Sequence, residues 1–103
     1  MFIVLLRFTD RREAAAQFMS GHKAWLDKGF AEGIFLMSGS LPPGLGGLVL
    51  AHHVGREALE RLVAADPFVS QGVVSAEIIE ATPSRVDERL QFLAATTPNP
   101  LPG

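Results

Sequence analysis

The apolar run at the start of the chain is the feature that most constrains its fold. Residues 2–8 are apolar in both alternating sets, namely Phe2, Val4, Leu6 and Phe8 on one side and Ile3 and Leu5 on the other. Successive side chains of a strand point to opposite faces of a sheet, so this strand needs an apolar cover on both faces. The run is short and Arg7 interrupts it, so we interpret it as a buried strand and not as a signal peptide.

A long amphipathic helix is predicted after this strand. Asp10 can cap its N-terminus, with Glu13 reaching back from three residues later. One stripe of residues recurs at spacings of three and four, namely Ala15, Phe18, Met19, His22, Trp25, Leu26 and Phe30. The helix is expected to end near Gly29 and Gly33, because glycine favours helix C-termini.

Two further strands are predicted in the middle of the chain. Residues 34–37 are apolar and lead into Ser38-Gly39-Ser40. Residues 41–47 contain prolines and glycines in a combination typical of a turn or loop. Residues 48–54 then predict a third strand, and we expect the second and third strands to form an antiparallel hairpin.

A second helix and a fourth strand complete the folded part. After Gly55, the helical stripe consists of Ala58, Leu59, Leu62 and Val63. Asp66-Pro67 ends this helix, because the residue before a proline disfavours the helical conformation. Residues 73–81 alternate well enough to predict the fourth strand.

The end of the chain differs from the rest in composition. We expect one domain over residues 1–83 and a C-terminal extension over residues 84–103. Residues 85–94 predict a short helix, whereas residues 96–103 include three prolines and predict a flexible tail that folding does not require.

The order of elements, β-α-β-β-α-β, predicts an α+β fold of the ferredoxin-like class. In this fold, right-handed crossovers place both helices on one face of a four-stranded antiparallel sheet. The other face would then expose a large apolar patch, and such patches usually mark an interface. We therefore expect a homodimer that packs sheet against sheet.

Composition excludes several classes of function. The 103 residues are 48% hydrophobic and 19% charged, which indicates one folded domain and not a disordered chain. The formal net charge is −2 and no basic run occurs, so a nucleic-acid partner is not expected. No stretch is long enough for a membrane span, and a cytoplasmic protein is expected. Cysteine is absent, which excludes thiolate metal sites and a cysteine nucleophile.

His22 and Asp66 are the candidate catalytic residues. His22 lies on the helical stripe that faces the sheet, where an imidazole needs a hydrogen-bond partner. A backbone carbonyl could supply that partner, and Asp66 could serve only to cap the turn that follows the second helix. In the alternative, the Asp66 carboxylate holds the His22 tautomer and enables the ring to act as a general base or acid.

The other polar positions carry weaker signals. Ser38, Gly39 and Ser40 could contact a ligand at the end of a strand, or could be small residues that lead into a turn. His52 and His53 are adjacent on a strand and would point to opposite faces, so no metal site is expected there.

In combination, these segments resemble the YciI-like family, whose members are also called YCII-related domain proteins. The resemblance spans residues 1–82 and rests on four segments, which are Met1-Phe2-Ile3-Val4-Leu5, His22-Lys23-Ala24-Trp25-Leu26 ending at Gly29, Met37-Ser38-Gly39-Ser40, and Asp66-Pro67-Phe68 with Gly72. The sequence departs from the common pattern where relatives often have Gly-Pro after the second strand, because it has Gly39-Ser40 and its prolines follow at positions 42 and 43.

The resemblance implies a dimeric α+β barrel with a His-Asp dyad, which falls on His22 and Asp66 in this chain. Ser38, Gly39, Ser40, Trp25 and Phe68 are the expected substrate-binding residues. Among the activities known in the family is dehydrochlorination of a chlorinated hydroxyhydroquinone.

Two functions stay open at this point. The favoured one is a small enzyme without a cofactor or metal, which uses the dyad for proton transfer on a small cyclic or aromatic substrate. The reaction would be an elimination, an isomerisation or a tautomerisation. The alternative is a non-catalytic dimeric module that binds a small ligand or serves as an accessory subunit. A haem-degrading or quinol-oxidising monooxygenase fits less well, because those relatives carry other signatures and the chain has no tyrosine.

Overall fold

The structure is a computed structural model and describes residues 1–95; the tail expected over residues 96–103 lies outside the described residues. Four strands form one antiparallel sheet in the order β2-β3-β1-β4. Their bounds are β1 (Phe2–Phe8), β2 (Phe35–Leu41), β3 (Gly46–Ala51) and β4 (Val74–Glu80). The strand with apolar residues in both alternating sets, β1, lies in the interior of the sheet, between β3 and β4.

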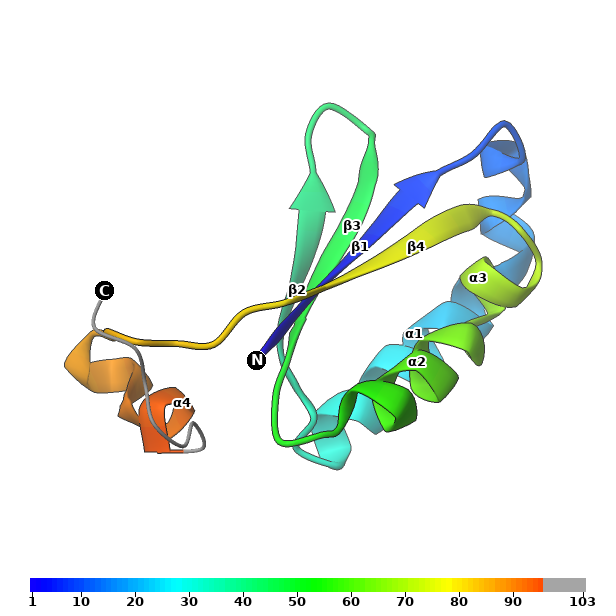
Figure 1. The fold of residues 1–103 in the computed structure, drawn as a ribbon. Coiled ribbons are helices and arrows are strands. Elements are labelled where there is room, and N and C mark those ends of the chain that lie inside the picture. Colours follow the sequence, from blue (N-terminus) through cyan, green and yellow to red (C-terminus); the bar gives the residue numbers. More distant parts are fainter. Residues whose placement is uncertain (96–103) are drawn as a thin grey trace.

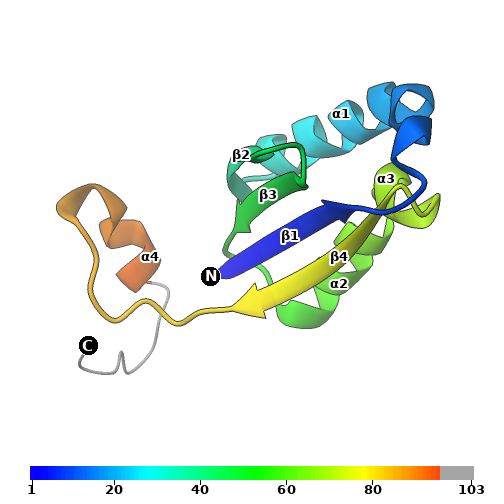
Figure 2. The ribbon, with the colours of Figure 1, turned by 90° about the horizontal axis from the view of Figure 1, so that it is seen from above.

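Two helices cover one face of the sheet. They are α1 (Ala15–Ala31) and α2 (Arg56–Ala64), which lie side by side in Figure 1. Seen from above, α1 follows the β2 side of the sheet and α2 follows the β4 side (Figure 2). The predicted ferredoxin-like α+β fold is confirmed.

The core lies between this helix layer and the sheet. Its buried side chains come from every layer, and they include Phe2, Val4 and Leu6 of β1, Val49 and Ala51 of β3, Trp25 of α1, and Leu59 and Val63 of α2. The alternating set that begins with Phe2 therefore faces the helices. Burial of these side chains supplies the main favourable free energy of folding.

The corner between β1 and α1 differs from the prediction. A 3-10 helix, η1 (Arg12–Ala14), precedes α1, and no side chain makes a capping hydrogen bond at either N-terminus. The prediction of Asp10 as N-cap is therefore wrong. Thr9 orders this corner instead, because its Oγ1 donates to Gly72 O at 2.6 Å and accepts from Arg11 N at 3.0 Å.

The predicted C-terminus of the first helix is confirmed. The N–H of Gly33 donates to Phe30 O and the N–H of Ile34 donates to Gly29 O, both at 3.0 Å. Gly33 has φ 74°, and this left-handed residue with two reverse hydrogen bonds is the Schellman motif. At Gly29, a Cβ would clash with the Phe35 ring, so glycine permits β2 to approach α1.

The hairpin has a shorter loop than predicted, and both of its strands have other bounds. Strand β2 runs to Leu41 and β3 begins at Gly46, so part of the expected 41–47 loop belongs to the sheet. Gly46 has φ 140°, and a Cβ there would clash with Leu6 O of the neighbouring strand. The glycine at position 46 thus lets β3 pair with β1, although the prolines and glycines of residues 41–47 predicted a turn or loop there. At its other end β3 stops at Ala51, before the predicted end at residue 54.

Asp66-Pro67 ends one helix and begins another. Helix α2 stops at Ala64, and a short helix, α3 (Pro67–Ser70), follows it. Asp66 is the N-cap of α3, with its side chain accepting from Phe68 N, and Pro67 occupies the first helical position. The cap is therefore present as predicted, and the additional helix was not predicted.

The C-terminal extension lies apart from the helix layer. Its helical part consists of η2 (Glu88–Leu90) and α4 (Gln91–Ala95), which begin later than the helix predicted over 85–94. Both views place α4 beyond the end of the sheet at which β1 begins (Figures 1 and 2). The domain boundary after residue 83 stays a prediction. Within residues 1–95, no helix has the length and apolar character that a membrane crossing requires.

Candidate functional site

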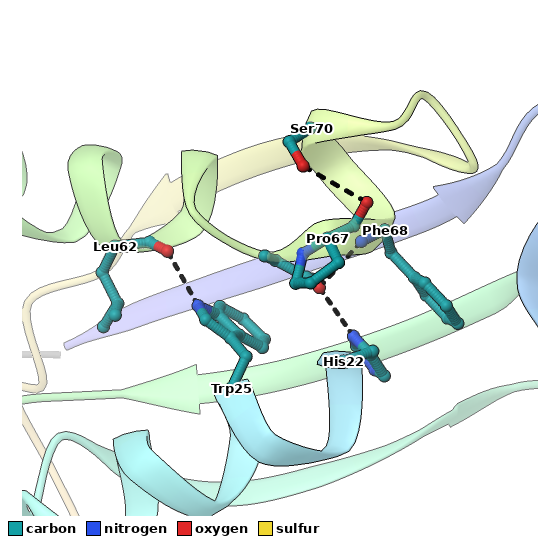
Figure 3. Close-up of polar contacts among 7 residues, drawn as sticks. His22, Trp25, Leu62, Pro67, Phe68 and Ser70 are labelled. Carbon is teal, nitrogen blue, oxygen red and sulfur yellow. Dashed lines mark hydrogen bonds and ion pairs between the residues drawn. The ribbon is translucent and has the colours of Figure 1, made fainter. Parts of the chain in front are cut away.

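His22 and Asp66 are in contact, as the sequence predicts. His22 lies in the middle of α1 and Asp66 lies at the start of α3, 44 residues later in the chain. The distance from His22 Nδ1 to Asp66 Oδ1 is 2.9 Å. Figure 3 shows the His22 side chain turned toward the segment that carries Pro67 and Phe68. Side-chain exposure is 15% for His22 and 0% for Asp66, so water barely reaches the contact.

Asp66 combines the two roles that its sequence position left open. Its Oδ1 accepts from Phe68 N at 3.0 Å and also faces His22 Nδ1. A carboxylate oxygen accepts, so the proton of this hydrogen bond belongs to Nδ1. Nε2 of His22 is then the ring nitrogen without a proton in the neutral side chain. Asp66 Oδ2 is buried and has no hydrogen-bond partner among the described residues.

Two aromatic rings hold the imidazole of His22 in place. The Phe68 ring is stacked on it, with centroids 4.1 Å apart and planes 4° apart. The Trp25 ring lies at 5.8 Å and 25°. Trp25 is itself fixed, because its Nε1 donates to Leu62 O at 2.8 Å (Figure 3). The ring of His22 therefore has little freedom to rotate.

His22 borders a cavity between α1 and the sheet. The cavity consists of two adjoining hollows of about 170 and 210 Å³. Both hollows are lined by the same five residues, which are Leu6, His22, Gly39, Ser40 and Gly47. Phe8, Met19, Gly46, Phe68 and Val74 complete the first hollow, and Leu26, Ser38, Leu48 and Val49 complete the second. Among the described residues, no Asp, Glu, Lys or Arg lines either hollow.

The strand register explains why this space is empty. Ser40 pairs with Gly47, and Gly47 pairs with Leu6 across the next ladder. Leu6 is a buried residue of the helix-facing set, so its neighbours in this row share that face. Two of the three residues in the row are a serine and a glycine, which are too small to fill the space below α1.

The structure distributes the predicted substrate-binding residues unevenly. Ser38, Gly39, Ser40 and Phe68 line the cavity. Trp25 lines neither hollow and lies beside His22 as a buried residue.

Sequence reasoning missed several wall residues. Phe8 and Met19 were interpreted only as apolar stripe residues, and Gly46 and Gly47 as part of a loop. The adjacent glycines next to a small-residue strand were the available signal, because missing side chains leave space in a sheet.

The described residues show no arrangement of metal ligands. Within residues 1–95, no group of three His, Asp or Glu side chains could hold a metal ion. His52 and His53 follow β3, which ends at Ala51, so the prediction that they are adjacent on a strand is wrong. Their ring centroids are 6.1 Å apart, and neither lines the cavity. The chemistry that the described cavity offers is therefore one imidazole with a buried carboxylate partner, two serine hydroxyls and apolar walls.

Comparison with known proteins shows a family and a shared fold. A family model described as the YCII-related domain matches residues 1–82. A similar solved structure is the 5-chloro-2-hydroxyhydroquinone dehydrochlorinase TftG from Burkholderia phenoliruptrix, in complex with 2,5-dihydroxybenzoquinone. It matches with a TM-score of 0.63 and 15% identity, over 79% of this chain and 93% of that chain, which shows a shared fold. The comparison with curated proteins gave no match.

Proposed function

The chain belongs to the YCII-related domain family, and on that premise we propose that it is a small-molecule enzyme in which His22 transfers a proton. Asp66 orients the ring, and the substrate is a small cyclic or aromatic compound. The reaction is an elimination, an isomerisation or a tautomerisation, and the side chains of the cavity suffice for it without a cofactor.

The observation that carries this proposal is the 2.9 Å contact between His22 Nδ1 and Asp66 Oδ1 beside the cavity. Because Nδ1 holds its proton toward Asp66, Nε2 is the nitrogen available to a substrate. A neutral imidazole is suited to general base catalysis near neutral pH. The stacked Phe68 ring keeps that nitrogen in one orientation, which lowers the entropic cost of reaching the reactive geometry.

The size and polarity of the cavity support the substrate class. Apolar walls favour a ring compound, and hollows of about 170 and 210 Å³ limit it to a small one. The hydroxyls of Ser38 and Ser40 could hydrogen-bond ring oxygens, and Phe68 could stack on the ring. The related TftG structure contains a dihydroxylated quinone and is a dehydrochlorinase, which is consistent with a compound of this kind.

The proposed proton transfer balances without another reactant. His22 Nε2 takes a proton from a hydroxyl group or an acidic carbon of the substrate. In an elimination, the electron pair left behind forms a new double bond, a leaving group such as chloride departs with its own pair, and the imidazolium then releases its proton to water. In an isomerisation or tautomerisation, the imidazolium returns the proton to a different atom of the same substrate. The charged imidazolium is stabilised in between by the Asp66 carboxylate.

Binding and turnover of defined probes test this function. We expect calorimetry to detect binding of 2,5-dihydroxybenzoquinone to the wild type, and Ser40→Leu to abolish it by filling the cavity. A chlorinated hydroquinone then serves as substrate, with chloride release as the readout. His22→Gln should lose at least about 100-fold in rate, because general acid–base catalysis contributes that much or more. Leu45→Ser, at an exposed position on the hairpin, is the control and should retain both properties.

Binding without turnover would favour the alternative function, a non-catalytic ligand-binding module. The observation on its side is that Asp66 also caps α3, so the dyad has a structural use. If His22→Gln binds the quinone like wild type and no probe is converted by either protein, the enzymatic proposal fails.

We also propose that the protein is a homodimer that pairs the sheet faces turned away from α1 and α2. One row of side chains on that face crosses all four strands, and it consists of Ile79, Ile3, Leu50 and Met37. Met37 and Ile79 are 42% and 40% exposed, which is costly for side chains of this size in water. Sedimentation equilibrium should report twice the chain mass of 11.1 kDa. A mass of one chain at micromolar concentration would exclude this dimer.

A further inference from the structure

The segment over residues 84–95, which we name the C-terminal arm, lies beyond the end of the sheet at which β1 begins (Figures 1 and 2). Just before the arm, Met1 and Ala81 exchange hydrogen bonds of 2.9 Å through their main-chain N and O atoms, which fixes where the arm leaves the sheet. Farther along, the Phe92 ring packs edge-on against His52, with centroids 5.5 Å apart. His52 directly follows the end of β3 at Ala51, two positions after Leu50.

The arm exposes apolar side chains that its own domain does not cover. Leu90 is 44% exposed and Phe92 is 43% exposed, whereas Leu93 is buried at 5%. Helix α4 has five residues, and isolated helices of that length are not stable in water. An arm of this kind needs a further packing surface to hold Leu90 and Phe92.

The surface around these side chains is electrically neutral. On the open sheet face, Arg7 and Glu77 pair with each other at 2.7 Å. The arm carries two arginines and two acidic residues, which sum to zero, and Arg89 pairs with Asp87 at 2.9 Å. A nucleic acid or a strongly charged peptide finds no complementary charge here, so the matching partner is itself neutral and apolar.

A second copy of this chain is such a partner. Its own open face presents the same apolar row and the same closed ion pair, and a twofold axis would let each arm reach the other copy. The arm also lies beyond the family match, which ends at residue 82. Its role is therefore additional to the matched domain.

We infer that the C-terminal arm is a dimerisation arm, whose Leu90 and Phe92 pack against a second copy seated on the open sheet face. This inference rests on the proposed homodimer and adds the arm to its interface. It is independent of the proposed proton transfer, because Leu90 and Phe92 line neither hollow of the cavity.

Sedimentation of full-length variants tests the arm. The double variant Leu90→Ser/Phe92→Ser removes both exposed side chains, and its dimer dissociation constant should rise at least about tenfold, because each dimer loses four apolar contacts. The matched control is Leu45→Ser, which removes a leucine that is 56% exposed on the hairpin and should leave the constant unchanged. Circular dichroism of each variant shows that the domain has folded.

Mixed samples of isotope-labelled and unlabelled chains provide a second readout that needs no variant. Isotope-filtered nuclear Overhauser spectra should show contacts between the Phe92 ring of one copy and the methyl groups of Ile79, Leu50 or Met37 of the other. Contacts found only within one copy would overturn the inference, since the arm would then cover its own face. A dimer that Leu90→Ser/Phe92→Ser leaves unweakened would overturn it while the sheet dimer stands. A monomeric wild type would overturn both.

Discussion

The energetic coupling between His22 and Asp66 is the property that most directly tests the structure of the site. Asp66→Ala removes one oxygen that accepts from both Phe68 N and His22 Nδ1. Loss of the helix cap costs about 1 kcal/mol. Loss of a hydrogen bond to a charged group costs about 1.5–3 kcal/mol. The free energy of unfolding should therefore fall by about 2.5–4 kcal/mol, a large part of the stability of a domain of this size.

A double-mutant cycle separates the two contributions. His22→Ala and the double variant complete it, and the shared hydrogen bond should appear as a coupling energy of about 1.5–3 kcal/mol. Arg56 and Glu60 provide the matched control, because their side chains contact each other at 3.6 Å but are 46% and 53% exposed. Exposed pairs of this kind couple by about 0.3–0.5 kcal/mol.

Urea denaturation measures these free energies, at one protein concentration for all variants. Far-ultraviolet circular dichroism is the main signal, and fluorescence of Trp25 adds a local probe because this ring lies beside His22. A coupling energy below about 0.5 kcal/mol for His22 and Asp66 would refute the reasoning, since it would equal that of the exposed control pair. The cap would then be the only stabilising contribution of Asp66.

Three further perturbations address the fold around the site. Gly29→Ala should lower the free energy of unfolding by about 1–3 kcal/mol, because its Cβ would clash with the Phe35 ring; an unchanged urea midpoint would contradict this close packing. Thr9→Val should cost about 1–2 kcal/mol in the same assay, because two hydrogen bonds of the β1–α1 corner are lost, whereas Asp10→Ala should leave the midpoint in place. In the arm, the side-chain hydrogen bond from Arg89 lowers the pKa of Asp87 below its ordinary value of 3.8. The capping hydrogen bond that Asp87 accepts from Arg89 N should therefore persist above pH 3.8 and be lost as the pH falls through the lowered pKa. The Arg89 amide resonance in an acid titration would show this, and a midpoint at or above 3.8 would contradict it.

The sequence by itself determined the order and type of the main elements. The two apolar sets of residues 2–8 predicted a strand, and β1 spans Phe2–Phe8. The stripe of α1 and its end at Gly33 were also readable, because helix periodicity and a left-handed glycine are properties of neighbouring residues. These features depend on contacts that are local in the chain.

Contacts between distant segments decided the features that the sequence left open or predicted wrongly. Thr9 replaces Asp10 at the helix corner because its hydroxyl reaches Gly72 O, which belongs to the segment before β4. Gly46 belongs to a strand because it fits against Leu6 O of β1. Neither partner can be found by periodicity, since each lies far away in the sequence.

The candidate site also combines features that the sequence predicted with features that only contacts between distant segments decided. The helical stripe placed His22 toward the sheet, and the Asp66-Pro67 pair placed a carboxylate at the end of the second helix, so both residues could be chosen from the sequence. Their contact at 2.9 Å depends on how closely α3 packs on α1, where a Cβ at Gly21 would lie 3.0 Å from Pro67 Cγ. The cavity depends on the register that sets Ser40 beside Gly47 and Leu6. Packing distance and strand register arise only when the layers assemble, which is why the tertiary structure alone decided them.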